Sequence, residues 1–413
     1  MARAIAAGPW AESPRSHALP AELSVAGLVA GAAGFFFAFR TAIVLVMVRV
    51  VLTDPQTGAA AGLALNYLLV IAAILVSAGP TRMPVLAMLR LAPLRWAGGF
   101  LFLSGCSLLW TRAASPSAAF AFWAAMAADV LIVLMLMRAY PAEDIGAALM
   151  KGYVWGACAV AVMAWMMPAQ SDLRLGDEEL LGPNQIGYVC AFAVFLAQYL
   201  ARKQVRGWAI PASFLALTLL RTLSKTSIVA FLAGEAVILL RDRSVTRSTR
   251  IVLAVLALAV LLTFQGLIAS YYDIYSNAGN QAETLSGRLG IWAYFLTASL
   301  ESPWIGHGFH SVWKVVPPFG PFEARHAHNE WLQQFYAYGV TGVVVVVGFY
   351  VSIFRYIRRH ASDAAKTLLL GFLLFVLVRG LADTEVFDLS LPLWFTLLVS
   401  VMLAESAAER SGA

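Results

Sequence analysis

The chain has 413 residues, of which 61% are hydrophobic and only 13% are charged, and its formal net charge is +6. Soluble domains carry about 25% charged residues, so this composition excludes an ordinary soluble globular protein. Apolar stretches long enough to cross a bilayer recur along the whole sequence, which predicts an all-α polytopic membrane protein.

Twelve membrane-spanning helices are predicted, in a single transmembrane domain over residues 24–404. The expected spans are 24–48, 62–79, 96–111, 118–137, 145–168, 183–201, 208–223, 226–240, 251–267, 328–354, 367–382 and 389–404. A short polar segment, 1–23, precedes this domain, and a tail, 405–413, follows it. Arg40 interrupts the first span.

The placement of basic residues between the spans predicts the orientation. If the N-terminus is cytoplasmic, the inner loops contain sixteen basic residues: Arg82, Arg90, Arg95, Arg138, Lys151, Arg202, Lys203, Arg206, Arg241, Arg243, Arg247, Arg250, Arg355, Arg358, Arg359 and Lys366. The opposite loops are leaner in basic residues and more acidic. Because Lys and Arg are enriched in cytoplasmic loops, both termini are predicted in the cytoplasm, and the positive charge does not indicate nucleic-acid binding.

The tight outer turn between the seventh and eighth spans, residues 220–226, departs from this charge pattern. It contains Arg221 and Lys225 on the side where basic residues are otherwise sparse. Since the positive-inside trend does not account for them, we expect these two side chains to bind an anion.

The outer loop between spans nine and ten, residues 268–327, has 60 residues and is rich in aromatic residues. A loop of this length in a compact protein is usually functional or disordered, and its composition favours function. Apolar residues at helical spacing predict an amphipathic interfacial helix over 285–300, ended by Pro303: Leu285, Leu289, Trp292, Leu296 and Leu300. Arg288 lies at the start of this helix, where it either contacts lipid phosphates or binds a substrate phosphate through two parallel hydrogen bonds.

His328 and Asn329 begin the tenth span, and after a gap of nine residues Gly339 and then Gly342 follow. The two glycines are predicted on one helix face that another helix could approach closely. His328 is either a hydrogen-bonded interfacial histidine or a general base, because an imidazole titrates near neutral pH.

Metal binding is an alternative interpretation of the histidines in this region. His307 and His310, together with His326 and His328, could chelate zinc. Their spacing is loose and no HExxH-type signature accompanies them, so the prediction is that the site contains no metal.

These motifs together resemble the signature of bacterial O-antigen ligases within the O-antigen ligase and polymerase superfamily. The resemblance lies in His328-Asn329 followed by the two glycines and covers about residues 170–345. The other matching segments are Gly182-Pro183-Asn184, Ser224-Lys225-Thr226, Leu285-Ser286-Gly287-Arg288 with Trp292, and Pro303-Trp304-Ile305-Gly306-His307-Gly308. Lys225 stands where the family commonly has an arginine, which keeps the charge but loses the two-pronged geometry.

The resemblance implies a GT-C-type glycosyltransferase in the bacterial inner membrane with a periplasmic active site. Such an enzyme transfers O-antigen glycan from undecaprenyl pyrophosphate to the lipid A-core oligosaccharide with inversion, and it uses no nucleotide or metal cofactor. Carried over to this chain, His328 is the base that deprotonates the acceptor. Arg288, Lys225 and Arg221 bind the pyrophosphate, and the supporting or acceptor-side residues are Asn329, His326, Asn184 and Asp383. The sugars and the oligomeric state do not follow from the sequence.

Three alternatives remain. An O-antigen polymerase and a protein O-oligosaccharyltransferase belong to the same superfamily. A lipid-linked glycan transporter would instead use Asp129 and Glu235, which are carboxylates within predicted spans, and Arg40 could pair with either of them. Arg379 and Asp383, at the outer end of span eleven, are expected either to pair with each other or to contact substrate.

Overall fold

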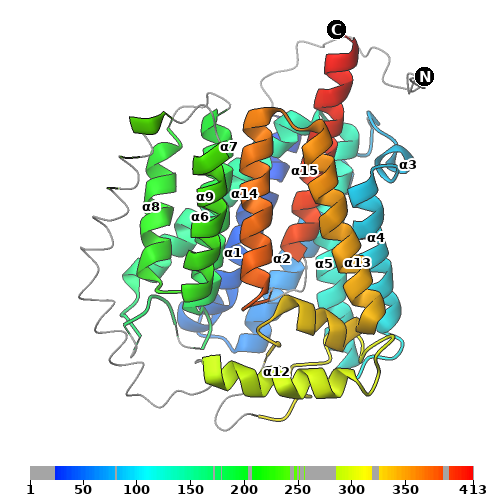
Figure 1. The fold of residues 1–413 in the computed structure, drawn as a ribbon, viewed down its shortest axis with the longest axis vertical. Helices are drawn as coiled ribbons and strands as arrows, with labels where there is room; N and C mark the ends of the chain where they lie inside the picture. Colours follow the sequence, from blue (N-terminus) through cyan, green and yellow to red (C-terminus); the bar gives the residue numbers. More distant parts are fainter. Residues whose placement is uncertain are drawn as a thin grey trace.

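The computed structural model describes residues 24–79, 81–170, 173–177, 179–202, 207–241, 246–248, 251, 255, 285–318, 325–384 and 390–412. These residues form a bundle of helices (Figure 1). The helices are α1 (Val25–Arg49), α2 (Pro55–Val76), α3 (Val85–Met88), α4 (Ala92–Ser107), α5 (Pro116–Ala139), α6 (Ala142–Met166), α7 (Pro183–Arg202), α8 (Ala209–Arg221), α9 (Lys225–Arg241), α12 (Leu285–Ser299), α13 (Glu330–His360), α14 (Asp363–Gly380) and α15 (Ser390–Gly412).

The all-α polytopic architecture predicted from the sequence is confirmed. Seven described helices are long and apolar enough to cross a membrane: α1, α2, α5, α6, α7, α13 and α15. Every predicted span except the ninth overlaps a described helix, and α1 is continuous through Arg40. The ninth span, 251–267, and the segment 1–23 lie outside the described residues, apart from residues 251 and 255. The last helix continues beyond the predicted end of its span at 404, to Gly412.

Direct backbone contact between helices explains several glycines in the predicted spans. A Cβ on Gly34 of α1 would lie 2.0 Å from the carbonyl oxygen of Leu149 in α6. A Cβ on Gly152 of α6 would lie 2.0 Å from the carbonyl oxygen of Gly31 in α1. Small residues permit this approach, which gives packing contacts that do not depend on water. The centre of the bundle is aromatic, because the fully buried Trp394 packs against Phe37 and Tyr153.

A buried polar network joins four helices in the middle of the bundle. Asp129 of α5 is fully buried and accepts hydrogen bonds from Arg40 of α1, Ser390 of α15 and Asn66 of α2, the last at 3.1 Å. Arg40 also donates to Ser390 Oγ at 3.0 Å. The expected partner for Arg40 is therefore Asp129. Glu235 accepts instead from Gln198 at 2.7 Å.

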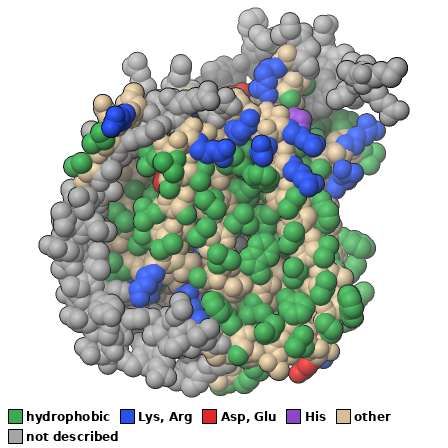
Figure 2. All heavy atoms as spheres, in the orientation of Figure 1, with side chains coloured by type: hydrophobic (Ala, Val, Ile, Leu, Met, Phe, Trp, Pro, Cys, Tyr) green, Lys and Arg blue, Asp and Glu red, His purple; other side chains and the backbone are tan. Residues whose placement is uncertain are grey.

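The surface of the bundle separates apolar from basic residues. Hydrophobic side chains cover the middle of the face in Figure 2, and Lys and Arg gather at the end where α15 finishes. Exposed residues at the ends of α9 and α13 belong to this basic zone: Arg241, Arg358 and Arg359. Helix α12 crosses the opposite end of the bundle (Figure 1), which is called the α12 end below.

Helix α12 confirms the helix predicted over residues 285–300. Ile291 and Phe295 are fully buried against Tyr336 of α13, whereas Leu296 and Leu300 from the predicted apolar stripe are 51% and 64% exposed. Leu296 and Leu300 thus face away from the protein, whereas Trp292 of the same stripe is half-buried and donates to the Ala327 carbonyl at 3.0 Å. An exposed leucine face is what an interfacial helix presents to lipid.

Candidate active site

The start of α13 explains why asparagine follows His328. Asn329 is the N-cap of α13: its side-chain oxygen accepts from the Leu332 N–H at 3.0 Å. Its Nδ2 donates to the Leu381 carbonyl, also at 3.0 Å, on the loop that follows α14. Because the first turn of a helix lacks backbone acceptors, this cap stabilises the helix. Asn329 therefore joins the two segments that carry the polar cluster.

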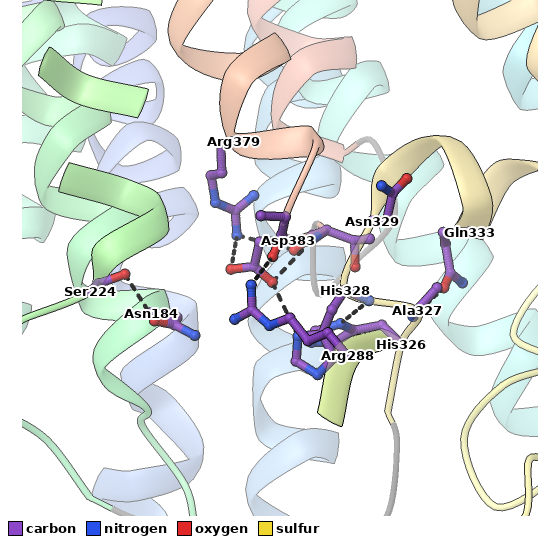
Figure 3. A network of polar contacts seen from close by, with 12 residues as sticks. Asn184, Ser224, Arg288, His326, Ala327, His328, Asn329, Gln333, Arg379 and Asp383 are labelled. Atoms are coloured by element: carbon purple, nitrogen blue, oxygen red, sulfur yellow. Dashed lines mark hydrogen bonds and ion pairs between the residues drawn. The ribbon is translucent and has the colours of Figure 1, made fainter. Parts of the chain in front are cut away.

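His328 has an unusual backbone conformation and lies against a second histidine. Its φ is 51°, in the left-handed region that few non-glycine residues adopt. Its N–H donates to His326 Nδ1 at 3.3 Å, and the two rings are 4.2 Å apart. Between them, the Ala327 N–H donates to Gln333 Oε1 at 2.9 Å. The chain is thereby bent so that both imidazoles lie on one side (Figure 3).

Asp383 faces these imidazoles from the end of α14. One of its carboxylate oxygens lies 3.9 Å from His328 Nδ1, and the other lies 3.3 Å from Arg379 Nη2. Burial alone would raise the pKa of Asp383, but the charges of Arg379, His326 and His328 outweigh it, so the pKa is lowered. The predicted Arg379–Asp383 pair is confirmed, and the same carboxylate lies near His328 Nδ1.

The electrostatic environment keeps His328 neutral at neutral pH. Burial, followed by the charge of His326, lowers the pKa of His328 well below its ordinary value, although Asp383 acts in the opposite direction. Burial also lowers the pKa of His326. A neutral imidazole can accept a proton, and a carboxylate beside its other nitrogen favours the cation that then forms. The arrangement therefore has the components of a general base.

Arg288 reaches the same cluster from the first turn of α12. Its Nη1 donates to the Ala382 carbonyl at 2.7 Å, next to Asp383. Three segments that are separate in sequence meet here: the start of α12, the turn before α13 and the loop after α14 (Figure 3). Arg288 is half-buried, and a guanidinium at this position carries the charge and donors that suit an anionic group.

A second wall of the site is formed by α7 and the α8–α9 turn. The Arg379 guanidinium lies 3.7 Å above the centre of the Tyr188 ring, which connects α14 to α7. One turn before Tyr188, Asn184 accepts a hydrogen bond from Ser224 of the α8–α9 turn at 2.8 Å. Lys225 is the first residue of α9 and is exposed. The predicted residues Asn184 and Lys225 therefore belong to the same end of the bundle as His328.

Arg221 and Arg174 hold the outer loop before α7 against this wall. Arg221 Nη1 donates to the Leu173 carbonyl at 2.6 Å, so this predicted anion ligand also has a structural contact. Arg174 is 5% exposed and donates to Asn184 Oδ1 at 2.9 Å and to the Thr222 carbonyl at 3.3 Å. Sequence reasoning missed Arg174. A basic residue in an otherwise acidic outer loop was the signal that could have identified it.

Gly339, the first glycine of the motif, lies at a break in helix α13. Helix α13 is kinked at Gly339, which has φ 65° and ψ −160°. The exposed backbone groups are satisfied by segment 303–308: the Val340 N–H donates to the Pro303 carbonyl at 2.8 Å, and the Gly308 N–H donates to the Ala337 carbonyl at 2.8 Å. A Cβ on Gly339 would lie 2.4 Å from the Trp304 carbonyl carbon.

The glycine face was expected to receive another helix, and this prediction is wrong. Gly339 receives the irregular segment 303–308, because a break in the helix exposes hydrogen-bonding groups that only an irregular backbone satisfies here. A Cβ on Gly342 would instead meet Tyr338 and Gln334 of α13 itself. The motif therefore fixes the position of the first part of α13, and with it His328.

The histidines divide into two groups. His307 is buried, with its Nε2 2.9 Å from the Ala298 carbonyl oxygen, and His310 stacks on Phe122. His326, His328 and Asp383 have possible metal-ligand atoms that all lie within 4.8 Å of one another. Arg379 and Arg288 lower the attraction of this cluster for a cation, because both place positive charge beside it.

The fold and the site together define a polytopic α-helical membrane protein with a histidine–aspartate–arginine cluster at one end of the bundle. Residues 210–347 match the family described as O-antigen ligase. Over 135 residues the chain is 30% identical to an O-antigen ligase of Pseudomonas aeruginosa, a match that covers 33% of this chain and 32% of that protein. The matched part is thus about a third of the length of this curated relative. These matches confirm the resemblance to the O-antigen ligase superfamily.

Proposed function

We propose that the protein is an O-antigen ligase that transfers O-antigen glycan from undecaprenyl pyrophosphate to a hydroxyl of the lipid A-core oligosaccharide. The observation that carries this proposal is His328 with its Nδ1 3.9 Å from the Asp383 carboxylate, and Arg288 at the same cluster. A base beside a cation suits a reaction in which a hydroxyl loses a proton while an anionic group leaves.

In the proposed reaction His328 Nε2 takes the proton of the acceptor hydroxyl, since Nδ1 faces Asp383. The hydroxyl oxygen forms a bond to the anomeric carbon as the bond from that carbon to the pyrophosphate oxygen breaks, with inversion. The bonding electrons leave with undecaprenyl pyrophosphate. Arg288, Lys225 and Arg221 provide positive charge for it, and the proton on His328 later passes to solvent. No step needs a nucleotide, because the donor is already activated.

We place the α12 end in the periplasm and the basic end in the cytoplasm of a bacterial inner membrane. Lys and Arg at the end of α13 and elsewhere in the basic zone support this orientation. Both termini are then cytoplasmic. The substrates, membrane lipids and the exposed leucine face of α12 meet at the periplasmic headgroup level.

The test is glycan transfer in vitro by purified protein, with undecaprenyl-pyrophosphate-linked O-antigen and rough lipopolysaccharide, without nucleotide and with a chelator. We expect wild-type protein to produce lipopolysaccharide bearing O-antigen and His328→Ala and Arg288→Ala to lose this activity. His360→Ala is the matched control, because His360 lies at the other end of α13. Transfer that persists in His328→Ala would contradict the proposed base.

The same assay separates the alternatives. If donor glycans lengthen without reaching lipid A, the protein is a polymerase, and if a protein acceptor is modified instead, it is an oligosaccharyltransferase. A complete absence of transfer by folded protein would contradict the enzymatic proposal. The match to an O-antigen ligase rather than to another member of the superfamily favours the ligase.

A further inference from the structure

Asn184 occupies the wall of the site that faces the His328–Asp383–Arg288 cluster. Its neighbour one turn along α7, Tyr188, lies under the Arg379 guanidinium at 3.7 Å. Helix α7 begins at the α12 end and α14 finishes there. Asn184, four residues before Tyr188, and Asp383, four residues after Arg379, therefore both lie on the α12 side of this contact.

Two donors fix the orientation of the Asn184 amide. Arg174 Nη2 donates to Oδ1 at 2.9 Å, and Ser224 Oγ donates to the same atom at 2.8 Å. Arginine has no acceptor, so the atom that faces Arg174 must be the oxygen. The amide nitrogen is thereby directed away from both partners, to the side on which Arg288 and Asp383 lie (Figure 3).

The amide nitrogen donates no hydrogen bond within the part of the chain that the structure describes, although Asn184 is half-buried. Arg174 and Ser224 are themselves buried, at 5% and 0% exposure, so the amide is fixed from behind by side chains with little freedom. A fixed donor of this kind loses little entropy when a ligand binds. Lys225, next to Ser224, gives the same wall a positive charge at the start of α9.

We propose that Asn184 Nδ2 donates a hydrogen bond to a phosphoryl oxygen of the lipid-linked pyrophosphate donor, and that Arg174 positions it for this contact. This inference rests on the proposed function and adds to it a residue that binds the lipid-linked substrate but not the acceptor. A phosphoryl oxygen matches the site because it is an acceptor with negative charge, and the cations Lys225 and Arg288 lie on the two walls on either side of it. Asn184 touches substrate in this proposal, whereas Arg174 acts through Asn184.

Asn184→Asp is the decisive variant. Aspartate keeps an acceptor for both Arg174 and Ser224, and it can form an ion pair with Arg174, so the fold is retained. It replaces the N–H donor by a negatively charged oxygen facing the phosphate. We expect the KM for the lipid-linked donor to rise about tenfold or more, since hydrogen bonds to charged groups are strong. The KM for lipid A-core should change by less than about twofold.

Gln185→Asp is the matched control, because it adds the same charge one residue further along α7, on another side of the helix. We expect it to leave the donor KM within about twofold of wild type. Asn184→Ala removes the amide N–H without adding charge. It should therefore raise the KM for the lipid-linked substrate less than Asn184→Asp does. This second variant keeps the test decisive if Asn184→Asp does not fold.

Binding of undecaprenyl pyrophosphate without glycan separates this inference from the proposed function, because it needs neither acceptor nor turnover. The measurement is the Kd for protein carrying His328→Ala, with and without Asn184→Asp, in lipid nanodiscs. We expect Asn184→Asp to weaken binding about tenfold or more. Equal Kd values, or a rise confined to the acceptor KM, would overturn the role of Asn184 even where transfer occurs. Absence of transfer by wild type, with binding still sensitive to Asn184, would overturn only the enzymatic proposal.

Discussion

At the scale of single residues, the side chains of His328, Asp383 and Arg288 come from distant segments and share one polar cluster. Burial lowers the pKa of His328 well below its ordinary value, and the charge of Arg379 is the largest cause that lowers the pKa of Asp383 against the effect of burial. Each group therefore has the protonation state that its proposed role needs at neutral pH. The cluster lies in loops at helix ends, where side chains from different helices can converge on a substrate.

The pH dependence of transfer tests the role of His328. Because its pKa is lowered, the neutral form persists below the ordinary pKa of histidine, and the rate should stay level from neutral pH down to below about pH 6.5. Removing the charge in Asp383→Asn lowers the pKa further, since Asp383 raises it. The acid limb should then move to lower pH. Rate–pH profiles for wild type and Asp383→Asn provide the measurement, and an acid limb that moves to higher pH would contradict this electrostatic arrangement.

Asp383→Asn should also lower the maximum rate. The variant loses the charge that favours the imidazolium as it forms, and an effect of about 10²–10⁴-fold is typical for loss of acid–base assistance. Turnover at saturating concentrations of both substrates is the quantity to compare. A matched control is Glu301→Gln, because Glu301 is an exposed carboxylate paired with Arg112 elsewhere in the same outer region. Equal rates for wild type and Asp383→Asn would exclude a role for this carboxylate in the reaction.

At the scale of elements, the break in α13 determines how the site is held. The kink at Gly339 gives segment 303–308 a set of backbone partners, and Asn329 ties the start of the helix to the loop after α14. The first part of α13 is therefore fixed independently of the long second part, which crosses the bundle. The sequence motif of two glycines after His328 is a requirement of this geometry.

Gly339→Ala should destabilise the protein by more than about 1 kcal/mol, because a Cβ would meet the backbone of Trp304 at 2.4 Å and the residue has φ 65°. Gly62→Ala is the matched control: α2 leaves open space at Gly62, so this substitution should be neutral or stabilising. Thermal unfolding in detergent measures both. A Gly339→Ala protein as stable as Gly62→Ala would show that segment 303–308 can move away at little cost.

At the scale of the whole molecule, glycine-mediated helix contacts and one buried ion pair hold the bundle together. Asp129 binds groups from α1, α2 and α15, and Ser390 among them begins the helix that follows the Asp383 loop. The network links the centre of the bundle to the base of the site. This arrangement gives Asp129 a structural role, whereas the transporter alternative treats it as an exchangeable proton site.

Removing one member of the Arg40–Asp129 pair should lower the stability of the protein. Asp129→Leu leaves the Arg40 charge without its carboxylate in an apolar interior, so we expect a loss of about 3–5 kcal/mol in stability. In the double variant Asp129→Leu with Arg40→Met, the loss of stability should be smaller than in Asp129→Leu alone, because no uncompensated charge remains. Unfolding of the two variants in detergent, compared with wild type, measures this difference. A double variant as destabilised as Asp129→Leu, or more so, would contradict this account of the pair.

The class of fold, the positions of the described spans and the motif residues near the site could all be predicted from the amino-acid sequence. These follow from local signals: apolar runs of membrane-spanning length, helical spacing in 285–300 and residue types such as His328 and Arg288. Local signals also place Asn184 and Lys225 at helix starts, although they do not say what either side chain faces.

Which of these residues meet could not be predicted from the sequence, because it depends on how the helices pack. The contact of Asp383 with His328, the donation from Arg288 to Ala382 and the clamp of Arg174 on Asn184 all join segments whose relative positions depend on helix packing. The break at Gly339 was equally hidden, because a glycine pair suits both a close helix contact and a kink. Hydropathy and spacing describe each helix alone, whereas a site at helix ends is set by how neighbouring helices align.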